Sequence, residues 1–304
     1  MMNQANTIAI IGGFGFIGTN LVKNLVNNHQ YQSIYLIGKN KIQRINTKTN
    51  EHFECSRTAD NLVSVFNKVE TIIYLAWSST PFSSMVSTVT ENNVEQLKHY
   101  LKLITSSKLD RFIFISSAGA LYKSNDHKIF SEETDSSEVL TPYASEKLEA
   151  EAIVNQMLDG ICSTTILRPS NVYGPGQPFK LGMGLIPKLL LCAYKDEPIS
   201  LYEALGSERD YLYIDDFILA ITHFISEGKI SGLFNIASGK NTTLGALIVE
   251  IEKLTGTKIS HRLNIKIASN HAVISTKKMN RVCNWSSKID IVSGLSSTIA
   301  QYKS

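Results

Sequence analysis

Short apolar runs alternate with stretches of helical periodicity through the first half of the chain. TIAII, SIYLI, TIIYLA, RFIFISS and STTILR are apolar or β-branched at most positions, as strands buried on both faces of a parallel sheet are. Between them, apolar residues recur at helical spacing and predict helices over 16–28, 60–67, 84–107 and 142–157. Because parallel neighbours need crossover helices, the alternation predicts an α/β fold with a Rossmann-type, doubly wound parallel sheet.

The pattern loosens after Arg168. NVYGPGQPFKLGMG is rich in Gly and Pro and predicts an ordered loop, and short strands such as LFNIA then alternate with helices near 185–194, 215–226, 244–254, 277–283 and 289–302. We therefore expect a Rossmann domain over 1–168 and a smaller C-terminal α/β substrate lobe over 169–304, with some segments returning to the first domain. Open α/β sheets bind their ligands at the carboxyl ends of the strands, where such a lobe would lie.

Composition narrows the class of protein. The 304 residues are 43% apolar, enough for a sizeable core, and the formal charge of +3 is spread without the cationic block that tracks a nucleic acid. The seven histidines and four cysteines show no metal-ligand spacing, and the cysteines form no CxxC. No leader or membrane-spanning stretch is evident in the sequence. We expect a cytoplasmic protein without a metal, a membrane or a nucleic-acid partner.

A glycine-rich turn follows the first predicted strand directly. GGFGFIG places Gly12, Gly15 and Gly18 where the strand ends and the first helix begins. Such a turn needs backbone conformations without a Cβ penalty, and it lets a pyrophosphate approach the N–H groups and positive dipole of a helix N-terminus. The context predicts a dinucleotide site formed by Gly12, Phe14, Gly15, Phe16, Ile17 and Gly18.

The end of the second predicted strand bears on which dinucleotide binds. NAD sites usually offer an acidic residue there to the ribose 2′-OH. Here the chain reads IGKNK, with Gly38 in place of the acid and Lys39 and Lys41 beside it. Cations without a carboxylate favour a 2′-phosphate, so Lys39 becomes a candidate contact for NADP. If these lysines only solvate a loop, NAD remains the cofactor.

Tyr143 and Lys147 are the candidate acid/base pair. They lie four residues apart on a predicted helix that begins after Thr141-Pro142, so their side chains share one face. A cation beside a phenol stabilises the phenolate and lowers a pKa of about 10 toward the working pH. The spacing therefore predicts a tyrosine that exchanges a proton with substrate.

Five motifs in a fixed order carry a family resemblance. GGFGFIG, SSAGALY, YASEK, RPSNVYGPGQ and RDYLYIDD together resemble the extended short-chain dehydrogenase/reductase family of nucleotide-sugar epimerases, dehydratases and reductases, across nearly the whole chain. The resemblance implies a C-terminal lobe that holds a nucleotide-linked sugar, while Tyr143 moves a proton, the nicotinamide moves a hydride and Lys147 binds the nicotinamide ribose. It further implies a cofactor contact at Ala76 and substrate contacts at Tyr122, Asn171 and Arg209.

One position departs from the family pattern. Members usually carry Ser or Thr four residues before the tyrosine of the strand-end motif, and counting back from Tyr122 gives Ala118. The missing hydroxyl would hold the substrate oxygen against the catalytic tyrosine, and Ser116 or Ser117 is the available replacement. We name Ser117 as the third catalytic candidate. Losing one such hydrogen bond costs on the order of 1 to 4 kcal/mol, which slows an enzyme without abolishing its activity.

The leading hypothesis is an NAD(P)-dependent enzyme acting at C4 of a nucleotide-linked hexose. A 4-ketoreductase and a 4-epimerase use the same residues, so the sequence does not distinguish the two reactions. It also does not identify the sugar or the nucleotide base. The alternative is a catalytically silent regulatory or scaffold protein of the same fold, against which the retention of Tyr143 and Lys147 counts. The segments NNVEQLKHYLKLITSSKL and EKLEAEAIVNQML carry apolar stripes, most of which core burial explains. The family resemblance implies a homodimer through these two helices of each subunit.

Overall fold

A computed structural model describes residues 7–28, 31–80, 92–104, 109–122, 124, 126, 128–132, 141–178, 184–227, 229–265 and 270–303. The chain forms two compact units that exchange segments. Unit 1 contains Met1–Ser116, Pro142–Leu167 and Ile218–Leu233, and unit 2 contains Ser117–Thr141, Arg168–Phe217 and Phe234–Ser304. Residues 117–141 thus belong to unit 2 although unit 1 precedes and follows them in the sequence, and residues 218–233 belong to unit 1 although unit 2 precedes and follows them. The division into two domains at 168 remains a prediction.

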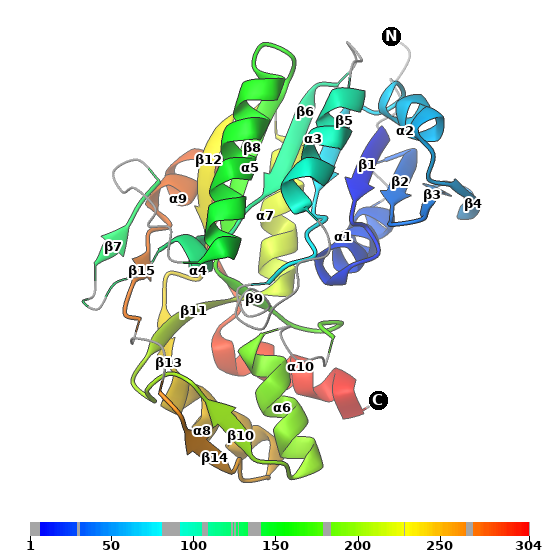
Figure 1. Cartoon of the computed structure of the whole chain (residues 1–304). Helices are drawn as coiled ribbons and strands as arrows, with labels where there is room; N and C mark the ends of the chain where they lie inside the picture. The colour runs from blue at the N-terminus through cyan, green and yellow to red at the C-terminus, as the bar shows by residue number, and fades with distance from the viewer. Residues whose placement is uncertain are drawn as a thin grey trace. The chain divides into compact units, whose positions relative to one another are not determined.

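An eight-stranded sheet is the central feature of the fold. Its strand order is β12-β8-β6-β5-β1-β2-β3-β4 (Figure 1). The bounds are β1 Thr7–Ile11, β2 Ser33–Ile37, β3 Lys41–Asn46, β4 Glu51–Ser56, β5 Thr71–Tyr74, β6 Arg111–Ile115, β8 Ser163–Pro169 and β12 Gly232–Ile236. Strands β2, β1, β5, β6 and β8 pair in parallel, which confirms the Rossmann-type sheet predicted from the buried runs.

An antiparallel hairpin extends one edge of this sheet and was not predicted. β3 pairs antiparallel with β2, and β4 pairs antiparallel with β3. Every residue of β4 is exposed, and β3 has only two buried positions, Ile42 and Ile45. The hairpin therefore lacks the apolar run that identifies a core strand, and its stability depends on pairing with β2.

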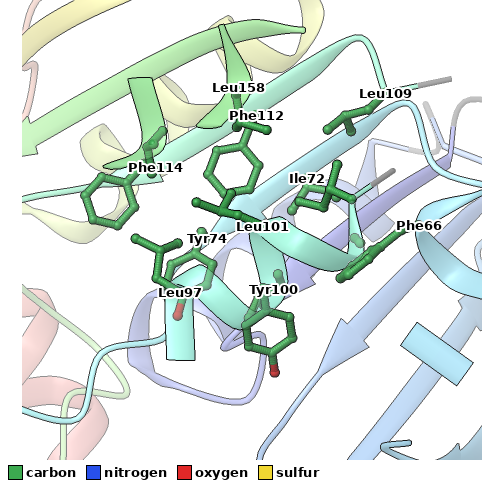
Figure 2. Packing of buried hydrophobic residues seen from close by; sticks show 14 of the residues in the cluster. Phe66, Ile72, Tyr74, Leu97, Tyr100, Leu101, Leu109, Phe112, Phe114 and Leu158 are labelled. Carbon is green, nitrogen blue, oxygen red and sulfur yellow. The ribbon is translucent and has the colours of Figure 1, made fainter. Parts of the chain in front are cut away.

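Crossover helices cover both faces of the sheet. Their bounds are α1 Phe16–Asn27, α2 Ala59–Phe66, α3 Asn93–Leu103, α5 Pro142–Leu158 and α7 Ile214–Ser226. Apolar side chains of α2, α3 and α5 form one buried cluster with β1, β5 and β6 (Figure 2). The crossovers from β1 to β2 and from β5 to β6 run in opposite directions along the sheet, so the right-handed crossover rule places α1 and α3 on opposite faces. Of the helix predicted over 84–107, the parts 84–91 and 105–107 lie outside the described residues.

The apolar stripes of α3 and α5 are buried within unit 1. Val94, Leu97 and Leu101 of α3 and Ala150 and Val154 of α5 all belong to the buried cluster. The exposed positions of the two helices carry polar or small side chains, namely Glu95, His99, Lys102, Pro142, Ser145, Glu149, Ala152, Asn155 and Gln156. The homodimer through these helices remains a prediction. Within the described residues, no helix has the length and apolar content that crossing a membrane requires.

Unit 2 contains small sheets and the remaining helices. A three-stranded sheet joins β9 Asn171–Tyr173, β11 Glu208–Tyr213 and β13 Asn241–Thr243, with β11 in the centre. Two strand pairs are β10 Ile199–Leu201 with β14 His261–Leu263, and β7 Ile129–Phe130 with β15 Val273–Ile274. The helices are α4 Ala118–Leu121, α6 Leu185–Lys195, α8 Leu244–Thr255, α9 Lys277–Cys283 and α10 Ile291–Lys303.

Candidate active site

The glycine turn has the geometry of a backbone cradle. Gly12 has φ of +87°, and a Cβ at this position would lie 2.8 Å from the backbone nitrogen of Ala76. A Cβ on Gly18 would lie 2.6 Å from the carbonyl oxygen of Gly12, so helix α1 begins in direct contact with the turn. The structure thus brings together Gly12 and Ala76, two predicted cofactor residues that are 64 positions apart in the sequence. No side chain caps α1 at Gly15, and an uncapped helix N-terminus presents N–H donors that suit an anion.

The turn after β2 holds the residues predicted to distinguish NADP from NAD. The N–H of Gly38 donates to the carbonyl of Lys41, and a Cβ on Gly38 would lie 2.8 Å from the Phe14 ring. Lys39 is exposed at this turn. Nζ of Lys41 lies 5.2 Å from the centroid of the Phe14 ring and 2.8 Å from Oε2 of Glu54. Sequence reasoning missed Glu54 because it lies on β4 of the unpredicted hairpin.

Tyr143 and Lys147 share one face of α5, as their spacing predicted. Nζ of Lys147 lies 5.9 Å from the centroid of the Tyr143 ring, and its hydrogen bond of 2.9 Å goes to the carbonyl oxygen of Ile115. The side chain is only 3% exposed. Two further rings face the ammonium, Trp77 at 3.8 Å and Phe114 at 5.1 Å from Nζ to the ring centroid.

Burial changes the proton equilibrium of Lys147. Desolvation lowers its pKa from the ordinary 10.5 to about 7, because the charged form loses its water. The carboxylates of Glu151 and Glu146 act in the opposite direction and partly offset the shift. An ammonium in this poorly hydrated place acts strongly on a nearby phenolate, and near neutral pH it is present in about half of the molecules.

Polar partners hold both carboxylates in place. Glu151, which is 7% exposed, accepts a hydrogen bond from the Ser116 hydroxyl. Glu146 accepts hydrogen bonds of 2.9 Å from the Ser79 hydroxyl and from Nδ2 of Asn93. Glu151 follows Lys147 by four residues on α5, so Tyr143, Lys147 and Glu151 form one line along the helix. The sequence showed this spacing in YASEKLEAE, but the burial of Glu151 was not anticipated.

The serine candidates differ in their bonding. The Ser116 hydroxyl donates its hydrogen bond to Glu151. Ser117 precedes α4 at its N-cap position, yet its side chain makes no capping hydrogen bond. Ala118 is fully buried in an apolar cluster of unit 2 that includes Phe130 and Ala237. Of the three positions, Ser117 therefore keeps a hydroxyl that neither a cap nor the core uses.

Tyr122 is buried within unit 2. Its side chain is 1% exposed, its ring stacks on Phe130 with centroids 5.1 Å apart, and its hydroxyl accepts a hydrogen bond of 2.7 Å from Nη1 of Arg168. These contacts fix Tyr122 beside Arg168 and Phe130 within unit 2, and its role in substrate binding remains a prediction.

Asn171 and Arg209 lie on neighbouring strands of unit 2. β9 and β11 pair in parallel with Asn171 opposite Tyr211, and Nδ2 of Asn171 donates a 2.8 Å hydrogen bond to the carbonyl of Asp210. Arg209 is therefore adjacent in the chain to the group that holds Asn171. Its Nη2 forms a salt bridge with Oε1 of Glu203, a residue that sequence reasoning missed.

The acidic residues near Arg209 and in the following helix are structural. The Asp210 carboxylate accepts hydrogen bonds from Ser170 at 2.6 Å and from the backbone of Gly239 at 2.7 Å. The Asp216 carboxylate accepts hydrogen bonds from Ser287 and from the backbone of Ile289. Across the described parts of the chain, no group of three or more His, Cys, Asp or Glu side chains has the arrangement of a metal site.

Comparisons with known proteins identify the family and the fold. The model of the NAD dependent epimerase/dehydratase family matches residues 8–237. A dTDP-4-dehydro-6-deoxyglucose reductase of Escherichia coli is 27% identical over 97% of each chain, and an ADP-L-glycero-D-manno-heptose-6-epimerase of Brachyspira hyodysenteriae is 29% identical over 76% of each. A UDP-glucuronic acid 4-epimerase of Bacillus cereus, solved with UDP-glucuronic acid and NAD, has the same fold with a TM-score of 0.79, 20% identity, and coverage of 98% of this chain and 99% of that one.

The chain belongs to the NAD dependent epimerase/dehydratase family, whose members modify nucleotide-linked sugars. Its own residues fit the dinucleotide: the bare backbone of Gly12 lies against Ala76, and no side chain caps the N-terminus of α1 at Gly15. When bound, the nicotinamide supplies reversible hydride transfer.

Proposed function

We propose that the protein is an NADP(H)-dependent 4-ketoreductase of a nucleotide-linked hexose. The observation that carries this proposal is the buried Lys147 ammonium beside the ring of Tyr143. A reductase needs a proton donor whose anion is stabilised as soon as the proton leaves, and this pair supplies both functions. The similarity to an E. coli reductase of a 4-keto nucleotide sugar, over 97% of both chains, supports the reaction class.

The chemical roles of the side chains follow from their environments. Tyr143 donates its phenolic proton to the oxygen at C4 while a hydride is added to the carbon, so that the ketone becomes an alcohol. Lys147 stabilises the Tyr143 phenolate and holds the nicotinamide ribose. Ser117 is the proposed hydroxyl donor to the substrate, in place of the hydroxyl that Ala118 lacks.

Two residues of unit 2 are proposed to bind the diphosphate of the substrate. Arg209 supplies a guanidinium, which matches phosphate geometry through two N–H donors at once. Asn171 supplies an amide whose position is fixed by its hydrogen bond to Asp210. Their location on adjacent strands supports a common ligand.

The preference for NADP(H) is supported by the turn after β2. Gly38 offers no carboxylate to repel a 2′-phosphate, and Lys39 lies exposed beside it. Lys41 is paired with Glu54, but the side chains are 46% and 55% exposed, and such surface pairs contribute little to stability. A 2′-phosphate can therefore replace Glu54 as the partner of Lys41 at small cost.

The Lys41 and Glu54 pair also supports a second candidate, a 4-epimerase that uses NAD. If the pair persists, the charge of Lys41 is compensated and less remains for a 2′-phosphate. An epimerase returns the hydride to the same sugar and retains its cofactor between turnovers. The same Tyr143 and Lys147 would serve that reaction.

The cofactor distinguishes the candidates. The purified protein is denatured, any released dinucleotide is identified by chromatography, and the emptied protein is titrated with NADH and NADPH. A protein that is purified empty, prefers NADPH and oxidises it with a 4-keto nucleotide sugar meets the proposal. Tightly retained NAD would favour the epimerase, and binding of neither dinucleotide would exclude both enzymes.

The Tyr143→Phe variant tests the mechanism. It removes only the phenolic oxygen, so NADPH binding should be retained while kcat falls by about 10² to 10⁴. A variant with most of its turnover intact would assign the proton transfer to another group.

A further inference from the structure

The proposed phosphate contact Arg209 already has an anionic partner within the protein. Oε1 of Glu203 forms a salt bridge with Nη2 of Arg209. The side chain of Glu203 is 13% exposed and that of Arg209 is 33% exposed, so the pair is partly withdrawn from water. An attraction between charges is stronger in such a place than at the open surface.

Glu203 is fixed by the loop that carries it. Its second oxygen, Oε2, accepts a hydrogen bond of 2.9 Å from Ser207, whose own hydroxyl accepts one of 3.1 Å from the N–H of Asn270. The loop between β10 and β11 is further bonded to the start of α8, where Gly245 donates to Leu205 at 2.8 Å. The carboxylate is therefore a built part of unit 2 rather than a freely rotating surface group.

Because Glu203 contacts Nη2 of Arg209, fewer guanidinium N–H groups remain for a ligand. A guanidinium can bind an oxyanion through two bidentate faces, and both of them use Nη2. Glu203 occupies a hydrogen of that nitrogen, so at most one face is left. A diphosphate bound there would also bring its negative charge close to the Glu203 carboxylate, and like charges repel.

We propose that Glu203 sets the affinity of the substrate site by competing with the substrate's diphosphate for Arg209. This inference rests on the proposed function, in which Arg209 binds that diphosphate. Glu203 keeps the guanidinium compensated when no substrate is bound. It also weakens the hold on the nucleotide, so that product leaves more readily.

The test is calorimetric titration of the full chain with UDP and with dTDP, since the base is not known. Glu203→Gln keeps the shape of the side chain but removes the charge: its amide oxygen can still accept from Arg209, while its amide nitrogen donates to the Ser207 hydroxyl. We expect it to bind the nucleoside diphosphate about tenfold more tightly than the wild type, equivalent to roughly 1.4 kcal/mol. Glu197→Gln removes the same charge from an exposed position of unit 2 and should leave the affinity unchanged.

A double-mutant cycle isolates the pair. Arg209→Gln should weaken binding by itself, and in that background Glu203→Gln should raise the affinity by clearly less than tenfold, because only the repulsion between the two negative charges remains to be relieved. Thermal melts of all variants verify that each protein is folded.

The outcomes separate the two proposals. An unchanged or weakened affinity in Glu203→Gln, with the wild type binding UDP or dTDP, overturns the role of Glu203 and leaves the substrate class intact. If neither protein binds UDP or dTDP while NADPH still binds, a UDP- or dTDP-linked sugar is refuted as the substrate, and with it the role of Glu203 toward such a diphosphate. An equal gain in the Glu197→Gln variant would attribute the effect to net charge and also overturns the inference.

Discussion

The ammonium of Lys147 lies 3.8 Å from the centroid of the Trp77 ring. Trp77 follows β5 and Lys147 lies on α5, so two distant segments of unit 1 meet at the proposed catalytic pair. A cation over an aromatic face is attracted by the ring quadrupole, and the attraction is larger when water is excluded. This attraction offsets part of the hydration free energy that the Lys147 ammonium loses on burial.

The burial of Lys147 should be visible in the pH dependence of stability. Its pKa is lowered to about 7 in the folded protein, so between pH 7 and 10.5 the unfolded chain binds more protons than the native state. The free energy of unfolding should therefore rise by about 2 kcal/mol from pH 7 to pH 9 through this group. Lys147→Met removes the titrating group, so urea unfolding of the variant should lack that increment. Parallel pH profiles for the two proteins would contradict the lowered pKa.

Glu151 should control the pH at which activity is lost. Its carboxylate raises the pKa of Lys147 against the larger effect of burial, so neutralising it should lower that pKa further. If protonated Lys147 is required, Glu151→Gln should shift the alkaline limb of the kcat profile to lower pH. Glu149→Gln, on an exposed position of the same helix, is the matched control. A changed kcat with an unmoved limb would indicate only a structural role for Glu151.

Lys39 should contribute to NADPH binding and little to NADH binding. A charge-assisted hydrogen bond to a 2′-phosphate contributes about 1.5 to 3 kcal/mol, so Lys39→Ala should lower the affinity for NADPH by roughly 10- to 100-fold. Glu54→Gln should have the opposite effect, because it releases Lys41 from its pair. Fluorescence titration with both dinucleotides measures the ratio of the dissociation constants for NADPH and NADH. Equal losses for NADH and NADPH in Lys39→Ala would place the lysine away from the 2′ position.

Gly119 should affect substrate binding through Asn171. A Cβ at position 119 would lie 3.3 Å from both Nδ2 and Oδ1 of that amide, closer than an ordinary van der Waals contact. Gly119→Ala should therefore displace Asn171 and raise KM for the nucleotide sugar by several-fold, while NADPH affinity stays constant. Gly206→Ala is a suitable control, because a Cβ there meets nothing within 4 Å. An unchanged KM would mean that Asn171 adjusts or does not contact substrate.

Much of the fold was predictable because its signals are local. Each parallel strand is an apolar run between turns, and the glycine turn directly links one strand to one helix. The shared face of Tyr143 and Lys147 follows from helical geometry alone. These features depend on neighbours in the sequence, and the structure agrees with them.

Other features depend on segments that only the folded chain brings together. The β3 and β4 hairpin is too exposed to leave an apolar signature, yet it delivers Glu54 to Lys41. The contacts of Tyr122 with Arg168 and Phe130 likewise join residues that are distant in the sequence or separated by a loop. The sequence by itself determined the glycine turn between β1 and α1 and the placement of Tyr143 and Lys147 on one face of α5, because both depend on neighbouring residues. Tertiary structure decided that Lys147 is enclosed by Trp77 and Phe114 and that Glu203 is bonded to Arg209, because burial and charge pairing depend on distances in space.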